Sequence, residues 1–427
     1  MPDFTADLLV QACTEGNSAA DLTIRHPLKG GSTAGVVHPP TYPRRDRDRT
    51  PMYPFLPVLD EDDGTVKHGV YLDTPASSIN RMELELAKQI HGNNPVLSKI
   101  NRIALRAGTN RVLYDLEVPN RLVDAIVKTA KLPNGASIMS SQEYLDAIRS
   151  TLADLRPLAN FSPDTAAFGG WDSTRVGGLA QKSLAEVSII GLLADQNRDP
   201  GMDFYGGLRI DPVSGPNSYN LTDEVARQLV LDWVNPTANV QAIVDGRGKG
   251  KGKGRGNSAD TADTTDPASG GEDKGSGESS ETRASNLVLG PLPYAKKRSG
   301  VVCSKIFREN VIKLTYARTM GFGGKVEQNA YARALLVAMV LVGDALARRD
   351  GLSLRAGCHL RASDVGTMTL NHNGGKVDEF VPLTVEQATA ILKTLLDSPK
   401  QTQLTWNGTQ FAADLSPVLL SAIKAEQ

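Results

Sequence analysis

The stretch GVYLDTPASSINRME, residues 69–83, joins a short apolar strand to a helix, and it decides the fold expected around it. Thr74 is placed to cap this helix, and Pro75 suits the first helical position because an N–H there would lack a partner in any case. Apolar residues at helical spacing then predict one buried face: Ile79, Met82, Leu86 and Ile90. The helix is expected to run toward His91.

The opposite face of this helix is polar and carries Ser77, Arg81 and Lys88, with Asn80 beside them. Free backbone N–H groups at a helix N-terminus bind phosphate, so Ser77, Asn80 and Arg81 are candidate phosphate contacts. An ordinary solvated helix face has the same pattern. Periodicity alone does not distinguish the two.

The whole chain has 427 residues, 40% of them hydrophobic, and a formal net charge of −1. This composition supports one large core or two smaller ones. It excludes a generally basic nucleic-acid-binding protein, so binding of a polyanion would depend on local patches. The N-terminus lacks a secretion signal, and the most apolar run, from Ala334, is only about half of a membrane span. The sequence therefore predicts a soluble, cytoplasmic protein.

No motif for a metal, a nucleotide or a catalytic triad is found. The three cysteines lie far apart, and the six histidines lack metal-ligand spacing. No lysine in the glycine-rich clusters is followed by Ser or Thr, as a phosphate loop requires. Asp172 and Asp211 follow apolar segments, where a carboxylate can hold a divalent ion, although turn or cap aspartates are commoner. We expect no metal and no cofactor.

Strand-like runs and amphipathic helices alternate along the chain. The predicted strands are 69–73, 109–118 and 165–171. The predicted helices are 120–130, 141–155, 178–194, 222–234 with Thr222 as cap, 331–349, 384–396 and 415–426. This mixture predicts an α+β fold built around a decorated sheet, as one domain over residues 1–427.

Residues 246–285 have almost no apolar side chain and are predicted to form a disordered loop inserted in that domain. Their first part alternates Gly with Lys and Arg, whereas their second part is acidic. The basic half fits a phosphate backbone. A solubilising linker with two mutually neutralising halves explains the composition equally simply.

Three further segments hold candidate nucleic-acid contacts. In FGGWDSTRVGG, residues 168–178, the candidates are Trp171 for base stacking and Ser173, Thr174 and Arg175 for phosphate. A core tryptophan before a glycine-rich turn is the alternative. Two basic patches, residues 41–49 and 294–300, add Arg44, Arg45, Lys296, Lys297 and Arg298. Together these loops predict one charged groove in a chain of almost no net charge.

Several of these segments, in matching order, resemble the backbone subunits of type I-U (also called I-G) CRISPR Cascade complexes, a branch of the RAMP superfamily. They are VVHPPTYP (36–43), LDTPASSINRME (72–83), PNRLVDAIV (119–127), FGGWDSTR (168–175), KSLAEVSIIG (182–191), LRIDP (208–212) and the apolar segment 332–360. The chain departs from the family pattern at Asn120, which replaces a His, and at Ala185 and Ala356, which replace serines.

The resemblance implies an RRM-like, ferredoxin-like antiparallel sheet with inserted finger and thumb elements and extra helices. Copies of the protein would oligomerise along a crRNA guide, hold its backbone and present it for pairing with target DNA. Other implied partners are the large subunit, the repeat-processing subunit and a recruited nuclease-helicase, with no membrane. The resemblance places the Asn80–Arg81 pair, the Trp171 segment and Lys182 near the RNA, with Lys296 to Arg298 as finger or thumb contacts.

Two other functions stay open. Some RAMP backbone subunits cut RNA with a loop aspartate, and Asp172 or Asp211 would take that part in a metal-dependent RNA endonuclease. The type I resemblance instead implies a non-catalytic protein, because a separate nuclease is recruited. A structural or protein-interaction module that binds no nucleic acid is the third alternative.

Overall fold

The computed structural model describes residues 3–33, 35–42, 52–108, 111–172, 178–194, 300–350, 352, 354–398 and 403–420, and the backbone of four short strands between them. The chain forms two compact units, Met1–Met202 with Arg298–Ser421, and Asp203–Lys297 with Ala422–Gln427. The four short strands are β10 (Asp203–Gly206), β11 (Asn220–Thr222), β12 (Glu281–Arg283) and β13 (Ala295–Arg298). β10 pairs with β13, and β11 pairs with β12. The predictions of one domain and of a disordered 246–285 loop stay predictions, since most of that loop lies outside the described residues.

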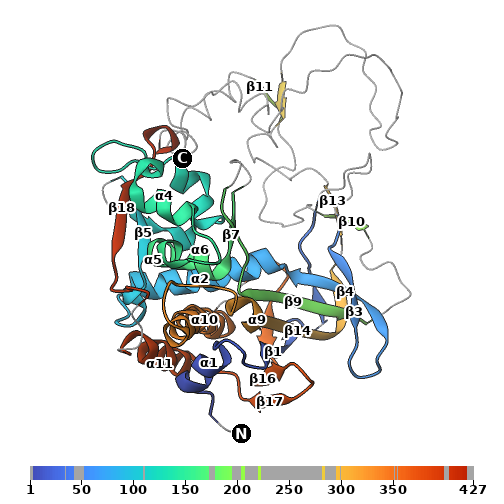
Figure 1. Cartoon of the computed structure of the whole chain (residues 1–427). Helices are drawn as coiled ribbons and strands as arrows, with labels where there is room; N and C mark the ends of the chain where they lie inside the picture. Colours follow the sequence, from blue (N-terminus) through green and yellow to red (C-terminus); the bar gives the residue numbers. More distant parts are fainter. Residues whose placement is uncertain are drawn as a thin grey trace, which may run out of the picture. The chain divides into compact units, whose positions relative to one another are not determined.

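A nine-stranded antiparallel sheet forms the centre of the larger unit (Figure 1). Its main strand order is β17-β16-β1-β14-β9-β4-β3, while β15 also pairs with β1 and β2 with β14. The strands are β1 (Ala19–Gly30), β2 (Val36–Val37), β3 (Phe55–Leu59), β4 (Val66–Asp73), β9 (Ala185–Leu193), β14 (Val301–Lys313), β15 (Leu360–Ala362), β16 (Thr367–His372) and β17 (Val377–Phe380). Buried and partly exposed residues alternate along β1, because helices cover one face of the sheet and leave the other open.

The helices against this sheet are α1 (Ala6–Ala12), α2 (Pro75–His91), α9 (Leu314–Ala317), α10 (Val326–Asp350) and α11 (Val385–Leu396). Figure 1 shows α10 between α2 and α11. A Cβ atom at Gly343 of α10 would lie 3.2 Å from Leu86 Cδ1 and 3.3 Å from Met82 Cβ, so the missing side chain lets α2 approach closely. By length and composition α10 could cross a membrane, but 94% of its most apolar window is buried within the protein. It is the core helix of this unit.

A three-stranded sheet and several short helices lie above α2 in the view of Figure 1. The sheet is formed by β5 (Arg102–Ala107), β6 (Arg111–Tyr114) and β18 (Gln410–Asp414), with β18 parallel to β5. The α-helices are α3 (Ala125–Lys128), α4 (Gln142–Ile148), α5 (Arg156–Phe161) and α6 (Pro163–Phe168). The 3₁₀ helices are η1 (Leu97–Lys99), η2 (Asp115–Glu117), η3 (Arg121–Val123) and η4 (Ile138–Ser140). A short hairpin of β7 (Gly170–Trp171) and β8 (Ala180–Gln181) follows α6.

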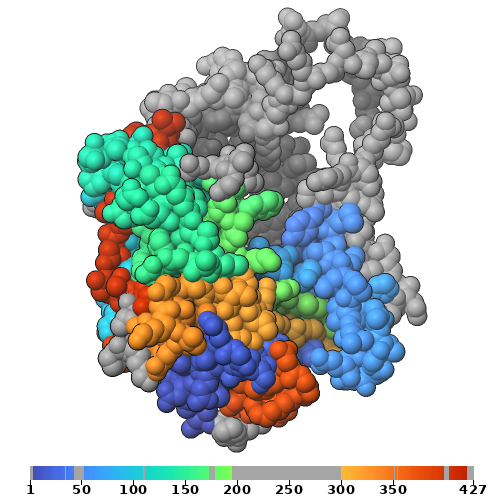
Figure 2. Space-filling model, viewed as in Figure 1, coloured from blue at the N-terminus to red at the C-terminus, as the bar shows by residue number. Residues whose placement is uncertain are grey.

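The N-terminal segment closes the opposite end of this unit. Figure 2 shows it in dark blue beside the β16-β17 hairpin in orange-red. Phe4 and Phe380 meet there edge to face, with ring centroids 5.3 Å apart. This contact joins the start of the described chain to the edge of the large sheet.

The α+β class is confirmed, and so are the elements around the opening stretch. Residues 69–73 form the end of β4, and Pro75 begins α2. Thr74 occupies the N-cap position, but its side chain makes no capping hydrogen bond to the helix. Ile79, Met82, Leu86 and Ile90 are all buried, as the periodicity predicts. The helices predicted at 331–349 and 384–396 are α10 and α11.

Two element predictions are wrong. Residues 165–171 were expected to be a buried strand, but residues up to Phe168 belong to α6 and only Gly170 and Trp171 are extended. Residues 178–194 were expected to be a helix, but they form β8 and β9. In β9 the buried residues Ala185, Val187 and Ile189 alternate with more exposed ones, which is the period of a strand.

Other boundaries differ from the predictions. The strand expected at 109–118 ends at Tyr114 and continues as η2. The helix expected at 120–130 is η3 followed by the single turn α3, and the one at 141–155 ends at Ile148. Thr222 ends β11, and the rest of 222–234 lies outside the described residues. Residues 417–420 are helical, and the remainder of that predicted helix also lies outside.

Candidate nucleic-acid interface

A buried ion pair joins two of the segments that the sequence analysis singled out. Glu83 of α2 and Arg121 of η3 form a bidentate pair, with Arg121 Nη2 2.6 Å from Glu83 Oε2. Arg121 Nη1 also donates to the carbonyl oxygen of Gly169 at 3.0 Å, and its guanidinium lies over the Phe168 ring. The backbone of Arg121 is left-handed, with φ of 54°. A residue other than glycine keeps this unfavourable conformation only where surrounding contacts stabilise it. The pair therefore fixes α2, η3 and the end of α6 to one another.

More buried acids surround this pair. The Ser162 hydroxyl lies 2.9 Å from Asp115 Oδ2 and 2.6 Å from Asp164 Oδ1. Burial, together with the adjacent Asp164 carboxyl, raises the pKa of Asp115 well above its usual range. Burial likewise raises the pKa of Glu83 to about 7, although Arg121 acts in the opposite direction. These carboxyls are shielded from solvent, and Asp115 Oδ1 also accepts from Ile103 N at 3.0 Å, so Asp115 joins η2 to β5 and to Ser162.

The β7-β8 hairpin stands directly on this network. Gly169, with φ of 88°, has no room for a side chain, because a Cβ there would lie 2.8 Å from Ser183 N and 2.9 Å from Gln181 O. Gln181 Nε2 donates to Ala166 O at 3.0 Å, which fastens β8 to α6. Trp171 is nevertheless 77% exposed. The indole therefore projects into solvent from a fixed base and is not the core tryptophan of the alternative interpretation.

Two lysines lie beside this hairpin in the described part of the chain. Lys128 Nζ is 2.8 Å from Asp172 Oδ1, and the Asp172 carboxylate is buried. Lys182 follows β8 with an exposed side chain, and its backbone N–H donates to Tyr316 Oη at 3.2 Å. Among the described residues, no group of three His, Cys, Asp or Glu side chains is placed to hold a metal ion. Asp211 lies outside the described residues.

Arg81 spans the turn between β4 and α2. Asp73 at the end of β4 is fully buried, and its Oδ2 accepts hydrogen bonds from Ser78 Oγ at 2.7 Å and from Arg81 Nε at 3.2 Å. Arg355 holds the same turn from the other side by donating to Leu72 O at 2.8 Å. Arg81 is thus engaged in holding the turn, and its proposed contact with RNA stays a prediction.

The remaining candidate contacts are only partly described. Ser77 and Asn80 lie partly exposed on α2. Lys296, Lys297 and Arg298 form most of β13, of which only the backbone is described. The candidates outside the described residues are Arg44, Arg45, Ser173, Thr174 and Arg175. The structure thus joins the 72–83, 119–127 and 168–175 segments through buried contacts, but it does not show that all the predicted basic loops form one groove.

Sequence reasoning missed the pairing of Glu83 with Arg121 and the pairing of Lys128 with Asp172. The signal was present, because Glu83 and Arg121 lie inside motif segments quoted for the resemblance and carry opposite charges. Their separation of 38 residues hides the contact from any local pattern. The three motif segments 72–83, 119–127 and 168–175 therefore meet at a buried junction.

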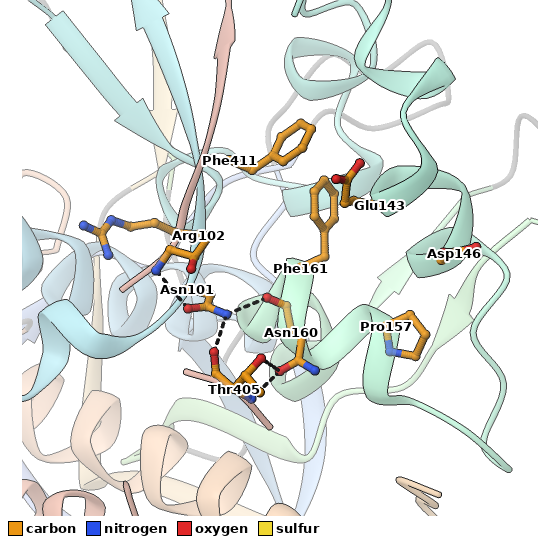
Figure 3. A pocket seen from close by; sticks show the side chains of 10 residues that line it. Asn101, Arg102, Glu143, Asp146, Pro157, Asn160, Phe161, Thr405 and Phe411 are labelled. Atoms are coloured by element: carbon orange, nitrogen blue, oxygen red, sulfur yellow. Dashed lines mark hydrogen bonds between the residues drawn. The ribbon is translucent and has the colours of Figure 1, made fainter. Parts of the chain in front are cut away.

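A separate pocket lies beside α4 and α5 (Figure 3). It has a volume of about 360 Å³ and is lined by Phe161, Phe411, Glu143 and Asp146 among others. The Phe161 and Phe411 rings meet edge to face at 4.9 Å. Its buried amide, Asn101 Nδ2, donates to Asn160 O at 2.9 Å and to Thr405 O at 3.1 Å. None of the predicted site residues lines this pocket, so it is distinct from the hairpin surface.

Residues 22–194 match the family model described as CRISPR-associated protein GSU0053. The match covers less than half of the chain, and over these residues the chain is similar to that CRISPR-associated family. The matched residues run from β1 to the end of β9 and include Glu83, Arg121, Gly169 and Trp171. The GSU0053 family is of the RAMP type, so the resemblance to a Cascade backbone subunit is confirmed. A comparison with curated proteins gives no match.

Proposed function

We propose that this protein is a non-catalytic crRNA-binding backbone subunit of a type I-U (I-G) Cascade complex. Copies of it would oligomerise along the guide RNA and present the guide to target DNA. The observation that carries this proposal is Trp171, which is 77% exposed on a hairpin anchored by the buried network of the family-matched region. An exposed aromatic ring on a fixed base is a platform on which an unpaired base stacks.

We also propose that the large sheet has an RRM-like core made of β1, α2, β9, β14, α10 and β16. Along the chain these elements run strand, helix, strand, strand, helix, strand, which is the ferredoxin-like order. In the sheet they lie as β16-β1-β14-β9, so the first and third strands of the set are central. The segments between α2 and β9 and between β9 and β14 would then supply the finger and thumb elements.

The proposed protein performs no chemistry of its own. Asp172, the aspartate considered for RNA cleavage, is buried and lies 2.8 Å from Lys128 Nζ, so metal binding there would have to break that ion pair. Within this proposal the protein acts in the cytoplasm. Its partners are crRNA, further copies of itself, the large and repeat-processing subunits and a recruited nuclease-helicase.

The test is purification of the protein from cells that carry a cognate CRISPR array and the partner subunits, followed by sequencing of the bound nucleic acid. Wild-type protein should retain repeat-spacer RNA. Trp171→Ala should weaken RNA binding by roughly five- to 150-fold, the loss expected for one stacked base. Trp171→Phe, which keeps a ring, is the matched control and should lose much less. Because Trp171 is so exposed, neither variant should lower the Tm appreciably.

Three results would contradict the proposal. Protein that carries no RNA in any preparation would favour the interaction module. RNA that is retained equally by Trp171→Ala would move the interface away from the hairpin. Magnesium-dependent cutting of complementary RNA, abolished by Asp172→Asn, would establish the endonuclease instead.

A further inference from the structure

The open face of the large sheet carries cations that the proposed function has not used. Strand alternation places Arg25 of β1 and Lys305 and Phe307 of β14 on this face. The intervening Arg308 points the other way, where its Nη1 lies 2.6 Å from Asp344 of α10. The Arg25 guanidinium lies over the Phe307 ring, 4.2 Å from its centroid. Two cations and an aromatic ring thus share the centre of the open face.

A cavity of about 400 Å³ lies over these side chains. Its floor includes Arg25, Lys305 and Phe307, and its rim includes Asp60, Glu61 and Asp62. The rim residues belong to the turn between β3 and β4. A turn from one edge of the sheet therefore reaches a cavity on the two central strands.

The carboxylates of this turn are paired with the cations of the floor. Glu61 pairs with Arg25, and Asp62 pairs with Lys305. Asp60 bridges Lys305 Nζ and Lys67 Nζ, each at 2.6 Å. Hydrogen bonds from Lys305, the larger effect, and from Lys67 hold the pKa of Asp60 well below its usual range.

The pairs made by the tip of the turn are exposed. Glu61 and Asp62 are 69% and 75% exposed at the side chain, and Arg25 and Lys305 are 29% and 39% exposed. Exposed ion pairs add little to stability, so an incoming anion can exchange with these carboxylates. A phosphodiester chain presents anionic oxygens in series, as this turn presents the carboxylates of Asp60, Glu61, Asp62 and Asp63.

We propose that Arg25 and Lys305 form a second phosphate-binding site for single-stranded guide RNA, which the acidic β3-β4 turn occupies in this structure and which RNA takes by displacing the turn. This inference rests on the proposed RNA-binding function but uses a different surface from the Trp171 hairpin. Released counterions favour the exchange on the RNA side, since condensed cations leave the strand when Arg and Lys engage it. Glu309 also lies beside the site, with its Oε2 3.9 Å from Arg25 Nε.

The test compares RNA binding by full-length variants. Glu61→Gln with Asp62→Asn removes the two exposed competitors and should raise affinity for a single-stranded RNA oligonucleotide by roughly three- to tenfold at low salt. Glu143→Gln with Asp146→Asn on α4 is the matched control, because it removes the same charge from the pocket of Figure 3. This control should change affinity by less than about twofold, as expected for distant screened charges. Adding Arg25→Gln and Lys305→Gln to the turn variant should abolish its gain.

The outcomes separate this inference from the proposed function. If no variant binds RNA, the proposed function itself fails. If wild-type RNA binding depends on Trp171 but the turn variant binds no better than the α4 control, only this inference fails. A gain that survives Arg25→Gln and Lys305→Gln would also overturn it. A DNA oligonucleotide of the same sequence tests the source of the phosphate, and a larger gain for DNA than for RNA would refute the assignment to the guide.

Discussion

Replacing Arg121 by methionine should destabilise this protein, and more strongly at pH 8 than at pH 6. Arg121 is 8% exposed and its partner Glu83 is 1% exposed, so the substitution leaves a carboxylate buried without its cation. Removing one partner of a buried ion pair lowers the free energy of unfolding by about 3–5 kcal/mol. The Gly169 carbonyl would also lose the donor at 3.0 Å that holds the base of the Trp171 hairpin.

The pH dependence follows from the pKa of Glu83, which burial raises from 4.5 to about 7 in the folded protein. Between those two values the folded state keeps a proton that the unfolded state has released, so stability falls as the pH rises and then levels off above 7. Arg121 lowers this pKa, and without it the pKa rises further. The fall in stability then continues above pH 7, by about 1.4 kcal/mol for each further pH unit.

The assay is denaturant or thermal unfolding at pH 6 and pH 8. It compares the wild type, Arg121→Met, Glu83→Gln and the double variant. The double variant should lose less than the sum of the single losses, because it leaves no buried charge unpaired. Equal destabilisation at both pH values, or additive losses, would show that Arg121 does not act through the Glu83 carboxylate.

Two more substitutions test the fold that supports the site. Asp344→Asn should lower the free energy of unfolding by about 3–5 kcal/mol, because the fully buried Asp344 accepts from Arg308, Asn310 and Arg348 at 2.6–2.8 Å. Burial raises the pKa of Asp344, but Arg308 and Arg348 outweigh burial and lower this pKa to about 2. The wild type should therefore lose the stabilisation from these ion pairs as the pH falls from 3.8 toward 2. Asp344→Asn should lack that loss in acid unfolding. Gly169→Ala should reduce stability by about 1–3 kcal/mol or more, since φ of 88° and ψ of 167° is a glycine conformation. Gly135→Ala, also at positive φ but with nothing within 4 Å of the added Cβ, is the control and should shift the Tm less.

The strand, turn and helix around residues 69–91 were predictable because their signals are local. Thr74 and Pro75 mark the start of α2, and the apolar residues of the helix repeat at a single period. α10 was predictable for another reason, since a run that is apolar nearly all round is typical of a buried helix. In each case the local pattern and the tertiary position agree.

β9 was not predictable as a strand for a physical reason. Its residues Ala185, Ile189 and Leu192 also fit an apolar helix face, so the pattern admits both periods. The choice is made by β14 and β4, which pair with β9 on its two sides. β14 lies more than a hundred residues further along the chain, so a pattern of neighbouring residues cannot predict its pairing with β9. The same limit hides the pairing of Lys305 with Asp60 across 245 residues.

The family motifs therefore need separating into two kinds of residue. One kind is buried and has a specific partner in the junction, as Glu83, Arg121 and Gly169 do. The fold itself explains why these residue types occur there. Trp171 lies in the same motifs, yet it is 77% exposed, so packing does not require an indole there. A large exposed aromatic ring on a base this constrained is better explained by an external partner than by folding. The proposed contacts to RNA should accordingly be sought among the exposed residues of the motif segments, and the buried charged residues should be tested by stability.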